Sequence, residues 1–510
     1  MSSSVSQGRF STGLRITDLD DFLPNSTECV LPMQGGAIPA GSVAAPLYGS
    51  HSSGASTSPA NAVARVTLSD CLSCSGCITS AETVLLSAHS VDAFVAESRQ
   101  RATQVGVVAV APAVLVSLAC AWQTTDLEYA FERLQRLFNE IGEFVVLMNG
   151  AGRCLSVLET CAEAAERLPC DANGEHASQG PLFASACPGW TFYVEKTQAS
   201  MVPYLSKAKS PQAMMALLAR HCYGAEAWFV SLAPCFDKKL ESQRETLRED
   251  NTFVLTTGEV LELSMRFERA QHSELERRNG GCLERLELTP LRGAWSTFGG
   301  LSGGYAVEVF RHVAKNVFHY DVAEADLKLA PVRERNPDLQ QLLLYEDCTT
   351  GAFSVTSQSI SETKRYRLRY AVATAYGFRN IQNIVRRMKT SGACAWDFVE
   401  VMACPGGCGN GGGQWLPAES LGKGSVQSSR RQHVRQLEQK GQWLPQYHVE
   451  ECPQIMELWT KLRASAPESL RITFAIRHDL LTDLESNEAQ RAEATLERSA
   501  SEAHRIANQW

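Results

Sequence analysis

The sequence predicts an α/β fold whose sheets are mostly parallel. Short apolar runs rich in Val, Leu and Phe, the composition typical of buried strands, recur from residue 105 onward. These strand-like runs are Gly106 to Val110, Glu143 to Leu147, Trp228 to Leu232 and Phe253 to Thr256. They alternate with helical patterns at Asp126 to Glu140 and Pro211 to His221. Such alternation favours parallel pairing, because each helix carries the chain back to the end of the sheet at which the strand began.

The size and composition of the chain limit its class. With 510 residues, it is long enough for roughly two to four structural units. A hydrophobic share of 44% and a charged share of 20% are ordinary for a globular protein and exclude fibrous and largely disordered classes. The net charge of -8 gives no general attraction to nucleic acid, although Arg430, Arg431 and Arg435 form a local basic cluster. We therefore expect no nucleic-acid partner.

The chain shows no pattern of secretion or of membrane insertion. Its first residues lack a basic stretch followed by an apolar run, so we expect a protein of a reducing compartment, the cytoplasm, with the nucleus as a further location. The most apolar stretch, Val105 to Ala121, is interrupted by Pro112. We expect this stretch to form a buried strand that runs into a helix, and we expect no membrane partner.

Seventeen cysteines in a reducing compartment point to metal binding or redox chemistry rather than to disulfides. Cys71, Cys74 and Cys77 follow a C-x2-C-x2-C spacing, which brings three thiolates from one tight loop around a small cluster. Cys29 can supply a fourth, because it precedes a stretch rich in Gly, Ala, Ser and Pro, residues 34–60, that we expect to be a flexible insertion. We call these four the N-terminal cysteines. Their spacing favours an iron-sulfur cluster; a zinc site and unligated thiols are the alternatives.

A second group of cysteines is spread over segments that lie far apart in the chain. The segments are Ser185 to Trp190, Ala233 to Lys239, Ser302 to Tyr305 and Phe398 to Gln414. The last is the most specific, because Cys404 and Cys408 stand four residues apart in a glycine-rich loop whose backbone can approach a bulky inorganic cofactor. Cys187 and Cys235 lie in the first two segments. We call Cys187, Cys235, Cys404 and Cys408 the core cysteines.

These segments resemble, in the same order and across most of residues 104 to 414, the cofactor-binding motifs of iron-only hydrogenases. The closer resemblance is to the eukaryotic hydrogenase-like proteins of cytosolic iron-sulfur assembly, the Nar or prelamin-recognition-factor-like family. Segments that look like signatures of that family are Ile16 to Phe22, Ser210 to Gln212 and Tyr376 to Asn383. The resemblance implies a core of two α/β lobes with mostly parallel sheets, a small N-terminal cluster-binding segment and a helical C-terminal tail.

The resemblance also implies cofactors and a role. It implies two 4Fe-4S clusters, one on Cys29, Cys71, Cys74 and Cys77 and the other on Cys187, Cys235, Cys404 and Cys408. It implies an assembly factor that receives clusters from a scaffold and passes them, with targeting-complex proteins, to apo-proteins of the cytosol and nucleus. An exchangeable N-terminal cluster and a structural core cluster fit this role. A nuclear lamina-binding adaptor is a further interpretation that rests on the family's name.

Two substitutions argue against the chemistry of hydrogenases. Ala186 stands where those enzymes carry the cysteine that relays protons, and alanine cannot carry a proton. Ala233 replaces the methionine that packs on the catalytic di-iron unit. We therefore expect a protein that is not an enzyme. The alternative is an iron-only hydrogenase or an iron-sulfur electron-transfer enzyme. Lys238 is retained at the position that contacts a cofactor ligand in hydrogenases, so a di-iron pocket stays an alternative as well.

The expected organisation has four parts. They are an N-terminal iron-sulfur segment (1–100), a hydrogenase large-subunit-like core (101–414), an exposed basic insertion (415–446) and a C-terminal small-subunit-like helical region (447–510). Within the last part, Leu481 to Asn508 has few helix breakers and predicts a solvated helix. We expect Trp510 at its end to bind in a partner's pocket through its indole and carboxylate; a frayed end is the alternative.

Overall fold

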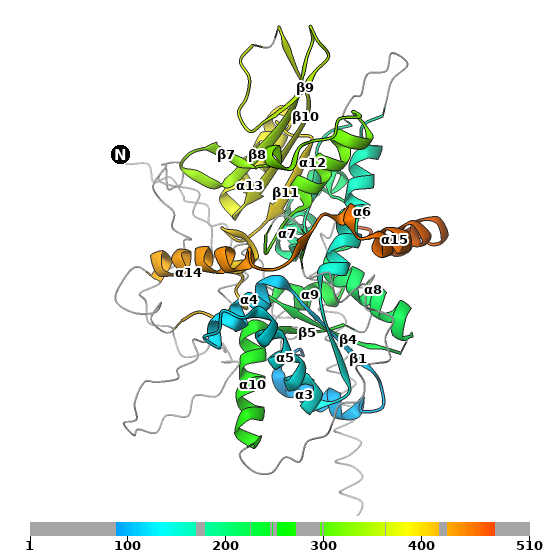
Figure 1. The fold of residues 1–510 in the computed structure, drawn as a ribbon, viewed down its shortest axis with the longest axis vertical. Helices are drawn as coiled ribbons and strands as arrows, with labels where there is room; N and C mark the ends of the chain where they lie inside the picture. Colours follow the sequence, from blue (N-terminus) through cyan, green and yellow to red (C-terminus); the bar gives the residue numbers. More distant parts are fainter. Residues whose placement is uncertain are drawn as a thin grey trace, which may run out of the picture.

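Two β-sheets, each covered by helices, form the frame of the molecule (Figure 1). In the computed structural model of the protein, the described residues are 88–169, 179–224, 226–244, 247, 252–271, 296–297, 300–362, 364–417 and 426–474. The predictions for the N-terminal cysteines, for the insertion at 34–60, for the helix over Leu481 to Asn508 and for Trp510 lie outside these residues.

The first sheet is entirely parallel. Its strand order is β2-β1-β4-β5, and every neighbouring pair runs in the same direction. The strands are β1 (Gly106–Val110), β2 (Phe144–Met148), β4 (Trp228–Ala233) and β5 (Thr252–Thr256). They are the four predicted strands, each matched to within one residue at either end.

Helices cover both faces of the first sheet, and this explains why its strands are apolar throughout instead of alternating with polar residues. Along β1, Val108 and Val110 pack on the outer helices, whereas Val107 and Ala109 face the centre of the molecule. The outer helices are α3 (Val91–Gln100), α4 (Pro112–Ala121), α5 (Leu127–Ile141) and α10 (Thr257–Gln271). The central helices are α6 (Gly150–Glu166) and α8 (Pro211–Tyr223).

Local sequence sets where these helices begin. The Asp126 carboxylate accepts a hydrogen bond of 3.0 Å from the backbone N–H of Tyr129 and so caps α5. Pro112 occupies the first turn of α4, where its missing N–H costs no helical hydrogen bond. The apolar stretch from Val105 therefore forms a strand followed by a helix, as predicted. Within the described part of the chain, no helix is both long and apolar enough to cross a membrane.

The second sheet is mixed. Its order is β3-β11-β10-β8-β7, with β9 paired to β8; the β3-β11 and β11-β10 pairs are parallel and the others antiparallel. The strands are β3 (Leu182–Ala184), β7 (Ala330–Arg333), β8 (Asn336–Asp347), β9 (Phe353–Thr356), β10 (Tyr366–Tyr376) and β11 (Phe398–Met402). Its outer face is covered by α7 (Pro188–Thr197) and α13 (Phe378–Ser391). The α/β class is confirmed, and short connections between β7, β8, β9 and β10 make that side of the sheet antiparallel.

A layer of helices lies between the two sheets. It consists of α6, α8 and α12 (Tyr305–Asn316), with α15 (Pro453–Ser465) packed against α6. One continuous apolar cluster joins this layer to both sheets, including Val107 and Phe229 of the first sheet and Val372 and Phe398 of the second. The two α/β lobes therefore share a core instead of meeting at a solvated cleft.

Short elements complete the fold. They are α9 (Asp237–Ser242), the 3₁₀ helices η2 (Ala199–Tyr204), η4 (Glu324–Asp326), η5 (Gly407–Asn410), η7 (Val449–Glu451) and η8 (Pro467–Leu470), and the paired two-residue strands β6 (Ser296–Thr297) and β12 (Gln446–Tyr447).

The expectation that residues 415–446 form an exposed basic insertion is wrong in part. Helix α14 (Val426–Gly441) buries Val434 and Leu437, and it packs against α4 and η5. Arg431 and Arg435 remain exposed on its outer side. The helix has one apolar face, and burial of that face outweighs the overall polarity of the segment.

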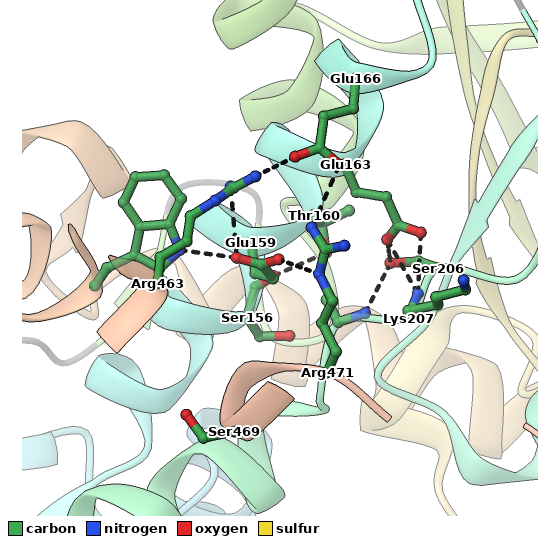
Figure 2. A network of polar contacts seen from close by, with 12 residues as sticks. Ser156, Glu159, Thr160, Glu163, Glu166, Ser206, Lys207, Arg463, Ser469 and Arg471 are labelled. Carbon is green, nitrogen blue, oxygen red and sulfur yellow. Dashed lines mark hydrogen bonds and ion pairs between the residues drawn. The ribbon is translucent and has the colours of Figure 1, made fainter. Parts of the chain in front are cut away.

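The C-terminal part of the described chain is fastened to α6 (Figure 2). Glu159 of α6, which is 1% exposed, accepts hydrogen bonds from Arg471 Nε at 2.7 Å and from Trp459 Nε1 at 3.1 Å. Arg463 and Arg471 also pair with Glu166, about two helical turns further along α6. These contacts hold α15 and η8 on the central layer.

Candidate metal centre

The core cysteines all follow the carboxyl ends of parallel strands. Cys187 comes soon after β3, Cys235 soon after β4, and Cys404 and Cys408 soon after β11. In open α/β sheets, ligands bind in the crevice outside the carboxyl ends of the strands. The first sheet contributes one of the four cysteines and the second sheet contributes three.

Backbone contacts bring the segments of the core cysteines together. The Trp190 N–H donates a 3.2 Å hydrogen bond to the Cys187 carbonyl, and a Cβ on Gly189 would lie 3.4 Å from the Cβ of Ala403, the residue before Cys404. The segment that precedes Cys235 meets the same loop from the other sheet, because the Pro234 carbonyl accepts a 2.9 Å hydrogen bond from the N–H of Gly413. The fold thus brings the segments of Cys187 and Cys235, which follow different sheets, against the loop that carries Cys404 and Cys408.

Glycine is required in the loop that carries Cys404 and Cys408. Gly407 has a φ of 81°, in the left-handed region, and a Cβ there would lie 2.3 Å from Ser302 Oγ. A Cβ on Gly411 would lie 2.3 Å from the Pro234 carbonyl oxygen. These close approaches explain why the loop is rich in glycine, because a side chain at either position would collide with a neighbouring segment.

The Ser302 segment supports this loop. Ser302 Oγ accepts a 2.6 Å hydrogen bond from the backbone N–H of Cys408. Behind it, the fully buried Glu400 of β11 accepts hydrogen bonds from the N–H of Ala306 at 3.0 Å and from the Tyr376 hydroxyl at 2.8 Å. Burial raises the pKa of Glu400, and these donors oppose the rise. The network locks β10, β11 and the start of α12 into one unit.

Electrostatics at the site favour binding of a cationic centre by the thiols. Burial, followed by the negative groups of Asp237 and Cys408, raises the pKa of Cys187 to about 12. Burial likewise raises the pKa of Cys408, while the positive Arg153 and Lys238 oppose that rise. At neutral pH Cys187 is therefore protonated unless a metal takes the place of the proton.

The donor set fits an iron-sulfur cluster better than a single ion. Among the described residues, no three side chains of His, Cys, Asp or Glu are grouped closely enough to hold one metal ion. A four-iron cluster takes one thiolate at each iron, so its ligands stand around a larger cofactor. Cys235 is buried, and Cys187, Cys404 and Cys408 are partly buried around a glycine loop. The N-terminal cysteines lie outside the described residues.

Comparison with known proteins identifies the family. Residues 104–412 match the family described as "Iron only hydrogenase large subunit, C-terminal domain". The chain belongs to this iron-only hydrogenase family. The matched region holds every core cysteine and all strands of the two large sheets, whereas α3, α14 and α15 lie outside it.

Several similar curated proteins carry names that place them in iron-sulfur assembly. The rat "Cytosolic iron-sulfur assembly component 3" is 36% identical over 459 residues, covering 83% of this chain and 88% of the rat protein. The Xenopus tropicalis "Cytosolic Fe-S cluster assembly factor narfl" is 33% identical over 523 residues, covering 95% of each. The Arabidopsis thaliana "Protein NAR1" is 35% identical over 446 residues, covering 80% of this chain and 84% of that protein. The family resemblance drawn from the motifs is confirmed.

Solved [FeFe]-hydrogenases share the fold. A structure from a study of oxygen inactivation of the H cluster superposes with a TM-score of 0.55 at 24% identity, covering 76% of this chain and 98% of that one. The apo HydA1 hydrogenase of Chlamydomonas reinhardtii gives a TM-score of 0.53 at 21% identity, covering 76% and 99%. At these identities the likeness establishes the two-lobe α/β fold.

Ala186 and Ala233, which the sequence predicts to lack the groups that hydrogenases use, lie within two residues of core cysteines. Ala186 packs against the central core and Ala233 is 2% exposed, so neither position offers a polar group. The Lys238 ammonium pairs with the Glu241 carboxylate at 2.5 Å. The positive charge of Lys238 is therefore already paired with a carboxylate of the same protein.

Sequence reasoning missed several residues that support the site. Arg153 donates to the carbonyls of Gly300 and Leu301 at 3.0 and 2.8 Å, and it places a positive charge near Cys408. Asp237 adds a negative charge near Cys187. Arg153 belongs to no sequence motif. The sequence signal that could have pointed to it is a charged residue in a helical segment that is otherwise largely apolar at its buried positions.

Proposed function

We propose that the protein is a component of the cytosolic iron-sulfur assembly machinery. It binds one 4Fe-4S cluster on the core cysteines and a second on the N-terminal cysteines, and it delivers clusters to cytosolic and nuclear apo-proteins. The observation that carries the proposal is the meeting of the core cysteines' segments around one glycine-rich loop, in a chain whose relatives over most of its length are named as assembly factors. Its partners are a cluster scaffold, targeting-complex proteins and apo iron-sulfur clients.

The chain's own residues are suited to hold the core cluster. The four thiolates are its ligands, and the backbone around Gly407 can lie close to its sulfides. A bound 4Fe-4S cluster supplies one-electron chemistry or serves as cargo. A cluster with four thiolate ligands carries net negative charge, and Arg153 and Lys238 supply nearby positive charge that offsets it.

The alternative, an iron-only hydrogenase or an iron-sulfur electron-transfer enzyme, uses the same cysteines. Two observations favour assembly over hydrogen turnover. Ala186 and Ala233 provide neither a proton carrier nor a thioether beside the site. Lys238 is already paired with Glu241, so its ammonium is committed to the protein.

Anaerobic reconstitution of the full chain tests the proposal. We expect about eight irons and eight sulfides per chain and no hydrogen evolution with a strong reductant. Cys408→Ala should lose one cluster signal in electron paramagnetic resonance, and Cys77→Ala the other. Cys394→Ala, a partly buried cysteine outside the site, is the matched control and should lose neither. Additional iron together with hydrogen turnover would establish the enzyme instead.

Delivery is tested separately from binding. The reconstituted protein should restore activity to a 4Fe-4S dehydratase prepared without its cluster, and a ferrous chelator should remove the N-terminal cluster before the core cluster. If the core cluster leaves first, the division into an exchangeable and a structural cluster is wrong. If no activity is restored while both clusters are bound, the delivery role fails and cluster binding stands.

A further inference from the structure

Helix α14 lies against the turn that carries Cys404 and Cys408. Val434 Cγ1 would be 3.1 Å from a Cβ on Gly406 and 3.7 Å from a Cβ on Gly409. Leu437, fully buried, lies beside the same turn, with its Cδ1 at 3.8 Å from the Gly409 position. The apolar face of α14 therefore closes one side of the turn, and glycine in the turn lets the helix approach this closely.

A hydrogen-bonded bracket ties α14 to the turn. Asn410 donates through Nδ2 to the Pro405 carbonyl at 2.9 Å, a bond that spans Cys408 and closes the turn on itself. Arg430 of α14 then donates to Asn410 twice, through Nε to the side-chain oxygen at 2.5 Å and through a terminal nitrogen to the backbone oxygen at 3.2 Å. One arginine thus holds both the side chain and the backbone of the residue that closes the turn.

A second link from the same helix reaches the start of the turn. Asp338, just beyond the start of β8, accepts a 2.9 Å hydrogen bond from the N–H of Gly406. The positive charge of Arg431 on α14 acts on this carboxylate. The turn is therefore held at Gly406 by Asp338 and at Asn410 by Arg430, with Cys408 between them.

We propose that α14 is the cover of the core cluster site, and that the Arg430 contact to Asn410 is the latch that slows loss of the cluster. This inference rests on the proposed binding of a cluster by the core cysteines. A chelator or an acceptor protein must reach the irons held by Cys404 and Cys408, and opening of the turn on its α14 side is the motion that exposes them. Arg430 is a positioning residue, since it acts on the cluster through Asn410.

The test measures iron release from the full chain carrying Cys77→Ser, so that the core cluster is the source of the iron. After anaerobic reconstitution, release to bathophenanthroline is followed by absorbance. We expect Arg430→Ala to release iron about 10-fold faster, because two hydrogen bonds from a charged group are lost. Arg435→Ala, an exposed arginine on the same helix, should release iron at the original rate. Arg430→Lys keeps the charge but cannot make both bonds and should lie between them.

Asn410→Ala removes the same bracket from the other side and serves if Arg430→Ala folds poorly. Asn410→Ala loses the bond from Arg430 Nε but keeps the Arg430 bond to its backbone oxygen, so adding Arg430→Ala to it should speed release by less than Arg430→Ala does alone. Equal release rates for Arg430→Ala and Arg435→Ala would overturn the latch. If the parent chain binds no iron on the core cysteines, the proposed function itself fails, and the two failures are distinguishable.

Discussion

At the scale of single residues, Gly407 combines two demands that only glycine meets. Its φ is 81°, and a Cβ would lie 2.3 Å from Ser302 Oγ. We expect Gly407→Ala to lower the free energy of unfolding by about 3 kcal/mol and to reduce the iron bound on reconstitution. Gly392→Ala is the control, because that residue has a φ of 65° with nothing within 4 Å of its Cβ position. It should cost about 1 kcal/mol and leave iron binding intact. Urea unfolding and iron assays compare the two, and equal losses would refute the role of the close approach.

Another residue-scale prediction concerns Cys452, which follows η7. A hydrogen bond from the Cys154 thiol lowers the pKa of Cys452 to about 7. Its thiolate should therefore form as pH rises through about 7, and alkylation by iodoacetamide should follow the same midpoint. Cys154→Ala should move that midpoint to higher pH, whereas Cys161→Ala, a buried cysteine on the same helix, should not. Mass spectrometry of the Cys452 peptide across pH 6 to 10 measures the midpoint, and an unchanged value in Cys154→Ala counts against the contact.

At the scale of elements, the fastening of the C-terminal segment depends on Glu159 (Figure 2). Glu159→Gln removes the buried carboxylate that accepts from Arg471 and Trp459. We expect a loss of about 2 kcal/mol in unfolding free energy, less than for a fully buried pair because Arg471 is partly exposed. Glu457→Gln breaks the Glu457–Lys461 pair, whose side chains are about 70% exposed, and should show no measurable change. Urea unfolding at constant pH compares them; similar losses would show that Glu159 is not a special anchor.

The elements also show what sequence can predict. The first sheet was predictable because its strands are buried on both faces and read as continuous apolar runs between helices. The antiparallel strands of the second sheet were not, since β8 has partly buried polar residues over its first half and so lacks a continuous apolar run. Helix α14 was misjudged from its polar composition. The i, i+3 pair Val434 and Leu437 is the local signal of its buried face.

At the scale of the whole molecule, the candidate site joins parts that no local pattern links. The core cysteines could be predicted as ligands because thiols and glycines at fixed spacing are rare and tied to one chemistry. Their supports were not found, because Arg153 and Glu400 are single charged residues whose meaning depends on partners in other elements. A site between two sheets is specified by long-range packing, and sequence motifs mark only its ligands.

That placement leads to a prediction for the whole chain. Cys235 follows the first sheet and Cys404 the second, so a cluster held by both ties the two lobes together. A cofactor that binds only the native state raises the stability of the protein. Reconstitution should therefore raise the thermal midpoint of the intact chain by about 5 to 10 °C. Cys235→Ala and Cys404→Ala should each abolish the core cluster's share of this rise, and the double variant should lose no more than either one. Anaerobic calorimetry at a single scan rate measures the rise, with the iron-free form of each variant as its own reference. A rise that persists in Cys235→Ala would mean that the first sheet does not take part in the site.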